Sequence, residues 1–190
     1  MTIYYFKGAP IIAPVSYETE EFGIANKHLN LKEDRISGAS QRWLVSFGVL
    51  PTGEFDTLAF LMTGWNTPVT FSFPQPHKDL TPLNGSVTAA ANIAAGAVTI
   101  ATADYTAIKV GRFIKFSNHN KVYMVTGKPA SNIISIYPNL FRAVPSGTVL
   151  HYGSNVSFTG LISSDQVRGI TFSDGILEDY GTIKLVEDFL

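Results

Sequence analysis

Side chains that could do chemistry are few and scattered along the chain. The histidines are His28, His77, His119 and His151, and no two of them have the spacing of a metal-binding pair. There is no cysteine, which excludes disulfide bonds, thiolate metal sites and a cysteine nucleophile. The glycine motifs of nucleotide-binding proteins and serine hydrolases are absent as well. We therefore expect no catalytic residue, no metal, no cofactor and no enzyme activity.

Two acidic clusters resemble carboxylate sites. A glycosidase pair is defined by the distance between its carboxyl groups, so the stretch Glu18–Glu21 does not by itself indicate one. We expect an exposed loop or arm there, or a contact between subunits. Asp174, Glu178 and Asp179 could bind calcium, but they lack the ligand series of a calcium-binding loop. We interpret both clusters as surface features without a catalytic role.

The best candidate for a binding surface interleaves basic and aromatic residues. As a surface for a partner protein or a glycan, it consists of Arg112, Lys115, Lys121 and Tyr123. Basic and aromatic side chains together also bind single-stranded nucleic acid, through phosphate attraction and base stacking. Strand alternation is the competing interpretation. It puts Phe113 and Lys115 on one face and Phe116 on the other, so that some of these aromatics belong to a core.

Composition indicates a folded, mainly β protein. Hydrophobic residues make up 45% of the 190 residues and charged residues 15%, which is enough apolar material for a core and excludes a disordered chain. Aromatic residues are abundant, and glycine and proline are spread along the chain, as in proteins built from short strands. The first residues lack a basic region before a long apolar stretch, and no stretch is apolar enough to span a membrane, so neither a signal peptide nor membrane insertion is expected.

Charge divides the chain into two parts. Residues 83–151 contain six basic residues and one acidic residue, a net charge of +5, and the remainder carries −6. The change coincides with the proline-rich stretch Pro74–Pro82, where a strand must end because proline has no amide donor. We predict a domain formed by residues 1–82 and 152–190, called the frame, and an inserted domain at 83–151, called the insert.

Hydrophobic spacing predicts the elements of the frame. Alternation predicts strands over 41–49, 68–73, 155–162, 166–172 and 182–186. A helix is predicted over 54–65, where Phe55, Leu58, Leu61 and Met62 recur at helical spacing. Asp174-Gly175 is typical of a hairpin turn. The predicted core of this domain includes Trp43, Phe47, Leu58 and Phe71.

The sequence of the insert predicts a small all-β domain. Short strands are predicted over 97–102, 112–117, 121–125, 133–137 and 148–152. Asn118-His119-Asn120 is a tight connection between two of them, because asparagine tolerates left-handed backbone geometry. Strands of this number and length are typical of a small OB-like β-barrel.

Two segments of the insert resemble a known family. They are Lys109–Thr126, with the sequence KVGRFIKFSNHNKVYMVT, and Ile133–Arg142, with the sequence IISIYPNLFR. The pattern resembles distal tail proteins and related baseplate ring proteins of long-tailed bacteriophages. The Gln41–Trp43 strand and the following helix are also similar to the ring domain of these proteins. The resemblance covers about residues 38–172 and does not place residues 1–37.

The resemblance implies a structural virion protein without catalytic activity. Its fold would be a split β-barrel ring domain with one packing helix, interrupted by an OB-like domain. Six copies would form a ring at the distal end of the phage tail, leaving a channel for DNA. Its partners would be other copies of itself, the tail tube protein, and baseplate hub or fibre proteins. The protein would be made in the host cytoplasm and reside in the tail tip.

Two further expectations follow from the ring hypothesis. An acidic frame suits a channel wall, because a repulsive lining keeps DNA from sticking. Apolar residues near both ends lie outside the clearest core elements and could dock on a neighbouring subunit: Tyr4, Tyr5 and Phe6 at the N-terminus, and Phe172, Ile176 and Leu177 near the C-terminus. The alternative hypothesis is an OB-type binding module for nucleic acid or carbohydrate.

Overall fold

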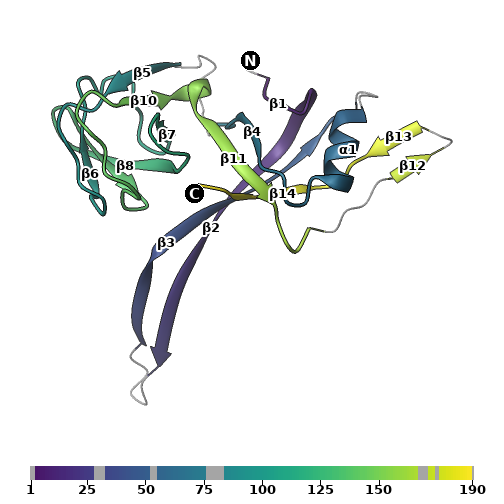
Figure 1. Cartoon of the computed structure of the whole chain (residues 1–190), viewed down its shortest axis with the longest axis horizontal. Coiled ribbons are helices and arrows are strands. Elements are labelled where there is room, and N and C mark those ends of the chain that lie inside the picture. Colours follow the sequence, from purple (N-terminus) through teal and green to yellow (C-terminus); the bar gives the residue numbers. More distant parts are fainter. Residues whose placement is uncertain are drawn as a thin grey trace.

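In the residues that the structure describes, the fold consists of two antiparallel six-stranded sheets, a two-stranded hairpin and one α-helix (Figure 1). The structure is a computed structural model that describes residues 3–27, 33–51, 55–75, 84–166, 171–173 and 176–189, with side chains except those of 22–40, 55 and 171–178. The predicted mainly β fold is confirmed.

The first sheet, here called the frame sheet, has the strand order β1-β2-β3-β14-β11-β4. Its strands are β1 (Tyr5–Phe6), β2 (Ala9–Lys27), β3 (Glu33–Val49), β4 (Val69–Ser72), β11 (Ser157–Ile162) and β14 (Ile183–Glu187). Trp43, Val45, Phe47 and Val49 alternate along β3 and are all buried, as their spacing predicted. The strands predicted over 41–49, 68–73, 155–162 and 182–186 are therefore confirmed.

Helix α1 (Phe55–Thr63) confirms the predicted helix, but its buried face differs from the prediction. Phe60 and Leu61 are buried, whereas Met62 is 48% exposed, so the placement of Met62 against the strands was wrong. Leu58 packs partly buried against the same cluster as Trp43, Phe47 and Phe71. The helix ends at Thr63, and at the next residue, Gly64, a Cβ atom would lie 2.6 Å from the Phe60 carbonyl oxygen, so only glycine fits.

The N-terminal strand completes this core. Phe6 is fully buried and packs edge-on against Phe47, Phe60 and Phe71, with ring centroids 5.2 to 5.6 Å apart. The prediction that Phe6 docks on a neighbouring subunit is therefore wrong, because the chain's own aromatic residues cover it. Tyr5, the next residue back, faces away and is 52% exposed.

The second sheet, here called the insert sheet, has the strand order β5-β10-β7-β8-β9-β6. Its strands are β5 (Gly85–Thr88), β6 (Thr99–Ala101), β7 (Phe113–Phe116), β8 (Val122–Ala130), β9 (Ile133–Tyr137) and β10 (Val149–Tyr152). The five predicted insert strands are confirmed, and β5 was missed because Asn84-Gly85-Ser86 reads as a turn. The sheet has its own core, which includes Ile100, Phe116 and Leu150.

Within the described residues, strand pairing leaves both sheets open, so closed barrels are not observed. The outer strands of the insert sheet nevertheless approach each other, because Ala89 and Thr102, just beyond β5 and β6, form a bridge. In addition, the Ala103 amide donates to the Thr88 carbonyl over 2.9 Å. The insert is thus an open sheet whose outer strands approach each other, and the closed OB-like barrel expected from the sequence is not observed among the described residues.

A long ribbon formed by β2 and β3 projects from the rest of the chain (Figure 1). The two strands remain paired as far as Lys27 and Glu33. Of the two expectations for Glu18–Glu21, the exposed arm agrees with the structure and the loop is wrong, because these exposed residues belong to β2 and pair with Gln41–Leu44 of β3. Near the C-terminus, β12 (Thr171–Ser173) and β13 (Ile176–Asp179) form the hairpin. The predicted strand over 166–172 and the Asp174-Gly175 turn lie largely outside the described residues.

Candidate functional site

The four residues of the predicted binding surface are buried. Arg112 and Lys115 are each 8% exposed, Lys121 is 2% exposed and Tyr123 is fully buried. The reason is that they lie in or next to β7 and the start of β8, two interior strands of the insert sheet whose residues 113–116 and 122–123 are all buried. Tyr123 faces the insert core, whereas Phe113, next to Arg112, joins the frame core. The interleaved residues therefore form a junction between the two sheets and not an exposed surface for a partner or a glycan.

A buried ion pair lies at the centre of this junction. Lys121 Nζ of the insert lies 2.5 Å from Glu187 Oε2 of β14. Lys121 also donates to the side-chain oxygen of Gln41 over 2.9 Å and to the Gln41 carbonyl. Glu187 accepts from the backbone amides of Val122, over 2.7 Å, and Trp43, over 3.1 Å. Each charged group is thus surrounded by groups of opposite polarity, as a buried pair requires.

Burial and pairing act in opposite directions on these two groups. Burial raises the pKa of Glu187, while the charge of Lys121 and the two amide donors oppose that rise. Burial lowers the pKa of Lys121, and Glu187 opposes that change. Each charged group is therefore stabilised by the other, because neither side chain has water to solvate its charge.

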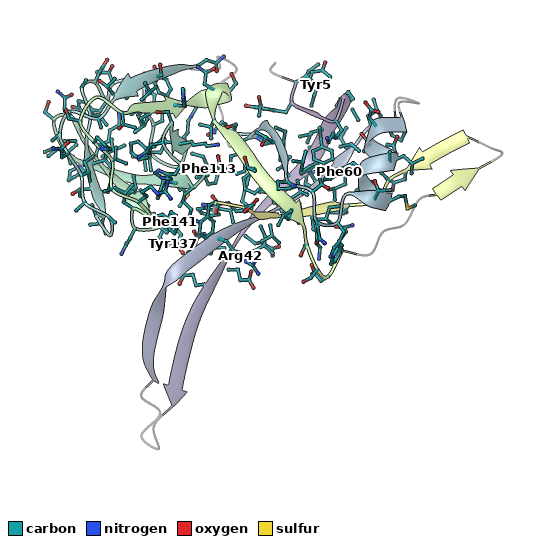
Figure 2. All side chains as sticks on the ribbon, viewed as in Figure 1. Tyr5, Arg42, Phe60, Phe113, Tyr137 and Phe141 are labelled. Carbon is teal, nitrogen blue, oxygen red and sulfur yellow. The ribbon has the colours of Figure 1, made fainter. Side chains whose placement is uncertain are left out.

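Further contacts bind the backbone of one sheet to side chains of the other. The Trp43 indole nitrogen donates to the Val122 carbonyl over 2.9 Å, and the Phe113 amide donates to Gln75 Oε1 over 2.9 Å. The Phe113 ring packs against Trp43, Phe73 and Tyr17 with centroids 4.7 to 5.2 Å apart. Figure 2 shows Phe113 between the insert strands and the frame. Residues distant in sequence therefore share one core.

A second contact region joins the insert to the ribbon and the C-terminus. The Tyr137 hydroxyl donates to Glu21 and lies 3.2 Å from Thr19 Oγ1, and its ring packs edge-on against Trp43. Figure 2 places Tyr137 and Phe141 near the base of the ribbon. The ring of Phe141 packs against Phe189 at 4.9 Å. Glu21, in the acidic stretch Glu18–Glu21, thus accepts a hydrogen bond from the insert.

A polar cavity of about 510 Å³ opens beside the junction. Its walls come from the turn after β7, from β10, from the start of β11 and from Phe189. The basic residues that line it are Lys115, His119, Arg142 and His151. No acidic residue is among the described residues that line the cavity. The sequence placed Lys115 in the candidate surface, but it gave no signal that Arg142 and His151 would join it.

His119 is held neutral at the wall of this cavity. The Phe141 amide donates to the Tyr123 hydroxyl over 3.0 Å. The Tyr123 hydroxyl can in turn donate to His119 Nε2, 2.8 Å away, and His119 Nδ1 can donate to Asn118 Oδ1, 2.7 Å away. This chain of bonds fits a histidine that donates from one nitrogen only. Burial, with the charges of Arg142, Lys115 and Lys121, lowers the pKa of His119 to about 4.

The other predicted features give no site for chemistry. Among the described residues, no group of three or more histidine, aspartate or glutamate side chains could hold a metal ion. Asp179 is exposed and accepts from the Gly181 amide over 2.8 Å, whereas Asp174 and the side chain of Glu178 lie outside the described residues. His28 and His77 also lie outside them. No described helix is both long and apolar enough to cross a bilayer.

Comparison with known proteins gives no assignment. The chain matches no family model, and no curated protein matches its sequence.

Proposed function

We propose that this chain is a structural protein that assembles into a ring at the distal end of a bacteriophage tail. In this role it joins the tail tube to the baseplate or receptor-binding apparatus and leaves a channel for DNA. The proposal rests on the sequence resemblance and on one structural observation, the projecting ribbon of β2 and β3.

The ribbon has open edges that a neighbouring copy can cover. Strand β14 pairs with β3 only between Leu44 and Phe47, so among the described residues Glu33–Gln41 has β2 as its sole partner strand. On the other side, β1 pairs with β2 only at Ala9 and Pro10. A two-stranded ribbon is marginally stable alone, and its free amides and carbonyls favour pairing with another chain. A head-to-tail contact of this kind closes into a ring when the rotation fits.

One face of the frame sheet is apolar and buried and the other is charged and exposed, an arrangement that suits a channel wall. One face packs on the aromatic core through Val45 and Phe47. The opposite face carries exposed charged groups, including Glu18 and the cross-strand pair of Glu20 with Arg42. With a net charge of −6 on the frame, this face would repel the DNA that passes along it. The proposed number of six copies comes from the resemblance alone.

Assembly is tested with a matched pair of proteins. In the ribbon variant, residues Ile24–Ile36 are replaced by Asn-Gly, which joins Gly23 to Ser37, two residues that already pair. Electron microscopy of the full chain, alone and with tail tubes as a template, should show closed rings around a channel, most of them with six copies. The ribbon variant should keep its thermal transition but lose the rings. A single copy or a trimeric spike at the tail tip would contradict the proposal.

The burial of the junction residues weakens the alternative of a nucleic-acid module. That hypothesis needs basic and aromatic side chains exposed together, and Arg112, Lys115, Lys121 and Tyr123 are all buried. Tight, salt-dependent binding of a single-stranded oligonucleotide by the full chain would revive it.

A further inference from the structure

The cavity beside the junction holds positive charge that no ion pair among the described residues neutralises. Lys115 is 8% exposed, and the hydrogen bond that the structure gives its ammonium group goes to the neutral hydroxyl of Ser157, 2.9 Å away. It forms no ion pair with any described residue. Glu187, a buried carboxylate whose charge acts on Lys115, is already bound by Lys121 and two backbone amides. A buried cation without a counter-charge is costly, and an anion in the cavity would offset that cost.

A second permanent cation lines the same cavity. Arg142 is exposed and follows the Leu140-Phe141 pair, whose Phe141 packs on Phe189. His119 indicates that these charges converge, because Arg142 and Lys115 both act to depress its pKa. His119 has both ring nitrogens engaged by Tyr123 and Asn118. Lys115 and Arg142 are therefore the groups available to a ligand, with His151 beside them.

We infer that this cavity binds the phosphate group of a small phosphate monoester, such as a phosphorylated sugar or polyol. A monoester carries nearly two negative charges at neutral pH, which matches the charges of Lys115 and Arg142. A guanidinium group binds phosphate oxygens in pairs, and lysine acts as a point charge. A volume of about 510 Å³ is in the range of sites for small molecules.

The remaining wall suits the hydroxyl groups of such a ligand. Ser117, Asn120 and Asn155 line the cavity and bring a hydroxyl and two amide groups. A nucleic-acid strand fits less well, since each diester carries a single charge and the frame, at −6, repels a polyanion. The walls described above come from a single copy of the chain, so binding can be tested on the isolated protein.

Calorimetric titration of the full chain tests this inference. Glycerol 3-phosphate and glucose 6-phosphate should bind with one site per chain and a Kd of about 1 mM or tighter, and glycerol and glucose should not bind. Inorganic phosphate should bind more weakly than the esters; equal binding would overturn the assigned hydroxyl contacts. A single-stranded oligonucleotide that binds more tightly than the esters would overturn the monoester assignment.

Three variants locate the binding. Arg142→Gln and Lys115→Met should each weaken binding of glycerol 3-phosphate about tenfold or more. Lys109→Gln removes an exposed charge of the insert that does not line the cavity, and should change the affinity less than about twofold. Because Arg142 is exposed, its variant keeps the test valid even if Lys115→Met fails to fold. Unchanged affinity in Arg142→Gln, or an equal loss in Lys109→Gln, would overturn the inference.

Discussion

Lys121 and Glu187, 66 residues apart in sequence, form an ion pair with an N–O distance of 2.5 Å at the junction of the two sheets. Their side chains are 2% and 0% exposed. The pair joins the turn before β8 of the insert to the end of β14 in the frame. Its position explains why a basic residue in the middle of the chain is buried: its counter-charge comes from the C-terminal strand.

Breaking this pair should be strongly destabilising. Lys121→Met leaves Glu187 buried without its cation, which costs about 3–5 kcal/mol, and we expect a similar loss for Glu187→Gln. The double variant should lose less than the sum, since no isolated charge remains. Urea unfolding of the natural chain, the two single variants and the double variant measures these changes in the free energy of unfolding. Lys184→Ala is the control: it breaks the exposed pair with Asp165, 3.3 Å apart, and should cost less than about 1 kcal/mol. Equal losses in the control and in Lys121→Met would contradict the assigned role.

Substitutions on the buried and exposed faces of helix α1 should differ in their effect on stability. Phe60 is 7% exposed and packs on Phe6, so Phe60→Ala should cost about 3–5 kcal/mol. Met62 lies on the other face and is 48% exposed, so Met62→Ala should stay within about 0.5 kcal/mol of the natural chain. Thermal unfolding of both variants compares the faces. A larger loss for Met62→Ala would show that the helix is rotated relative to the structure.

His119 should make the protein less stable in mild acid. Its folded-state pKa of about 4 lies below the ordinary value of 6.5, so between these values the unfolded chain binds more protons than the folded chain. Stability from this group should therefore fall as the pH drops from 6.5 to 4, by up to about 3 kcal/mol.

The measurement for His119 is the pH dependence of urea unfolding. The natural chain and His119→Gln are compared at several pH values between 7 and 4. Gln cannot take up a proton, so the variant should show a shallower decline even if it is less stable at pH 7. Identical slopes in the two proteins would show that His119 is not the group responsible.

Regions with one buried face were predictable from the sequence, and the junction was not. Along β3 the buried Trp43, Val45 and Phe47 alternate with more exposed residues, and such alternation in the sequence predicts a strand with one buried face. Along β7, Phe113 to Phe116 are all buried, so the exposed face assumed for Lys115 does not exist. No local pattern reveals that a second sheet covers a strand. The available hint was Glu187, the acid at the end of the mostly apolar strand β14.

The paired strands of the ribbon were not predicted, for a different reason. Charged residues such as Glu18 and Glu20 have low strand propensity, so they favour a loop when read alone. Their strand conformation comes from backbone pairing with β3, which includes the cross-strand ion pair of Glu20 with Arg42. Tertiary pairing overrides local propensity here.

Limited proteolysis tests the predicted division into frame and insert. Cleavage is expected within 76–83, where the charge changes and prolines cluster, or within 151–154. Because Phe113 and Val122 belong to the frame core, the fragments should elute together on gel filtration until a denaturant is added. Initial cleavage confined to the β7–β8 turn would contradict the division.

The shared core predicts that the two sheets unfold together. Phe113 belongs to the insert, yet its ring is 2% exposed and packs on Trp43, Phe73 and Tyr17 of the frame. Phe113→Ala should therefore cost about 3–5 kcal/mol and should shift the transition of Trp43, a frame residue. Trp43 fluorescence is followed in a Trp65→Phe background, alongside circular dichroism of the whole chain. The control is Phe141→Ala, whose ring is 41% exposed and which should cost no more than about 1 kcal/mol. A Trp43 transition that does not move in Phe113→Ala would show that the frame is stable without the insert.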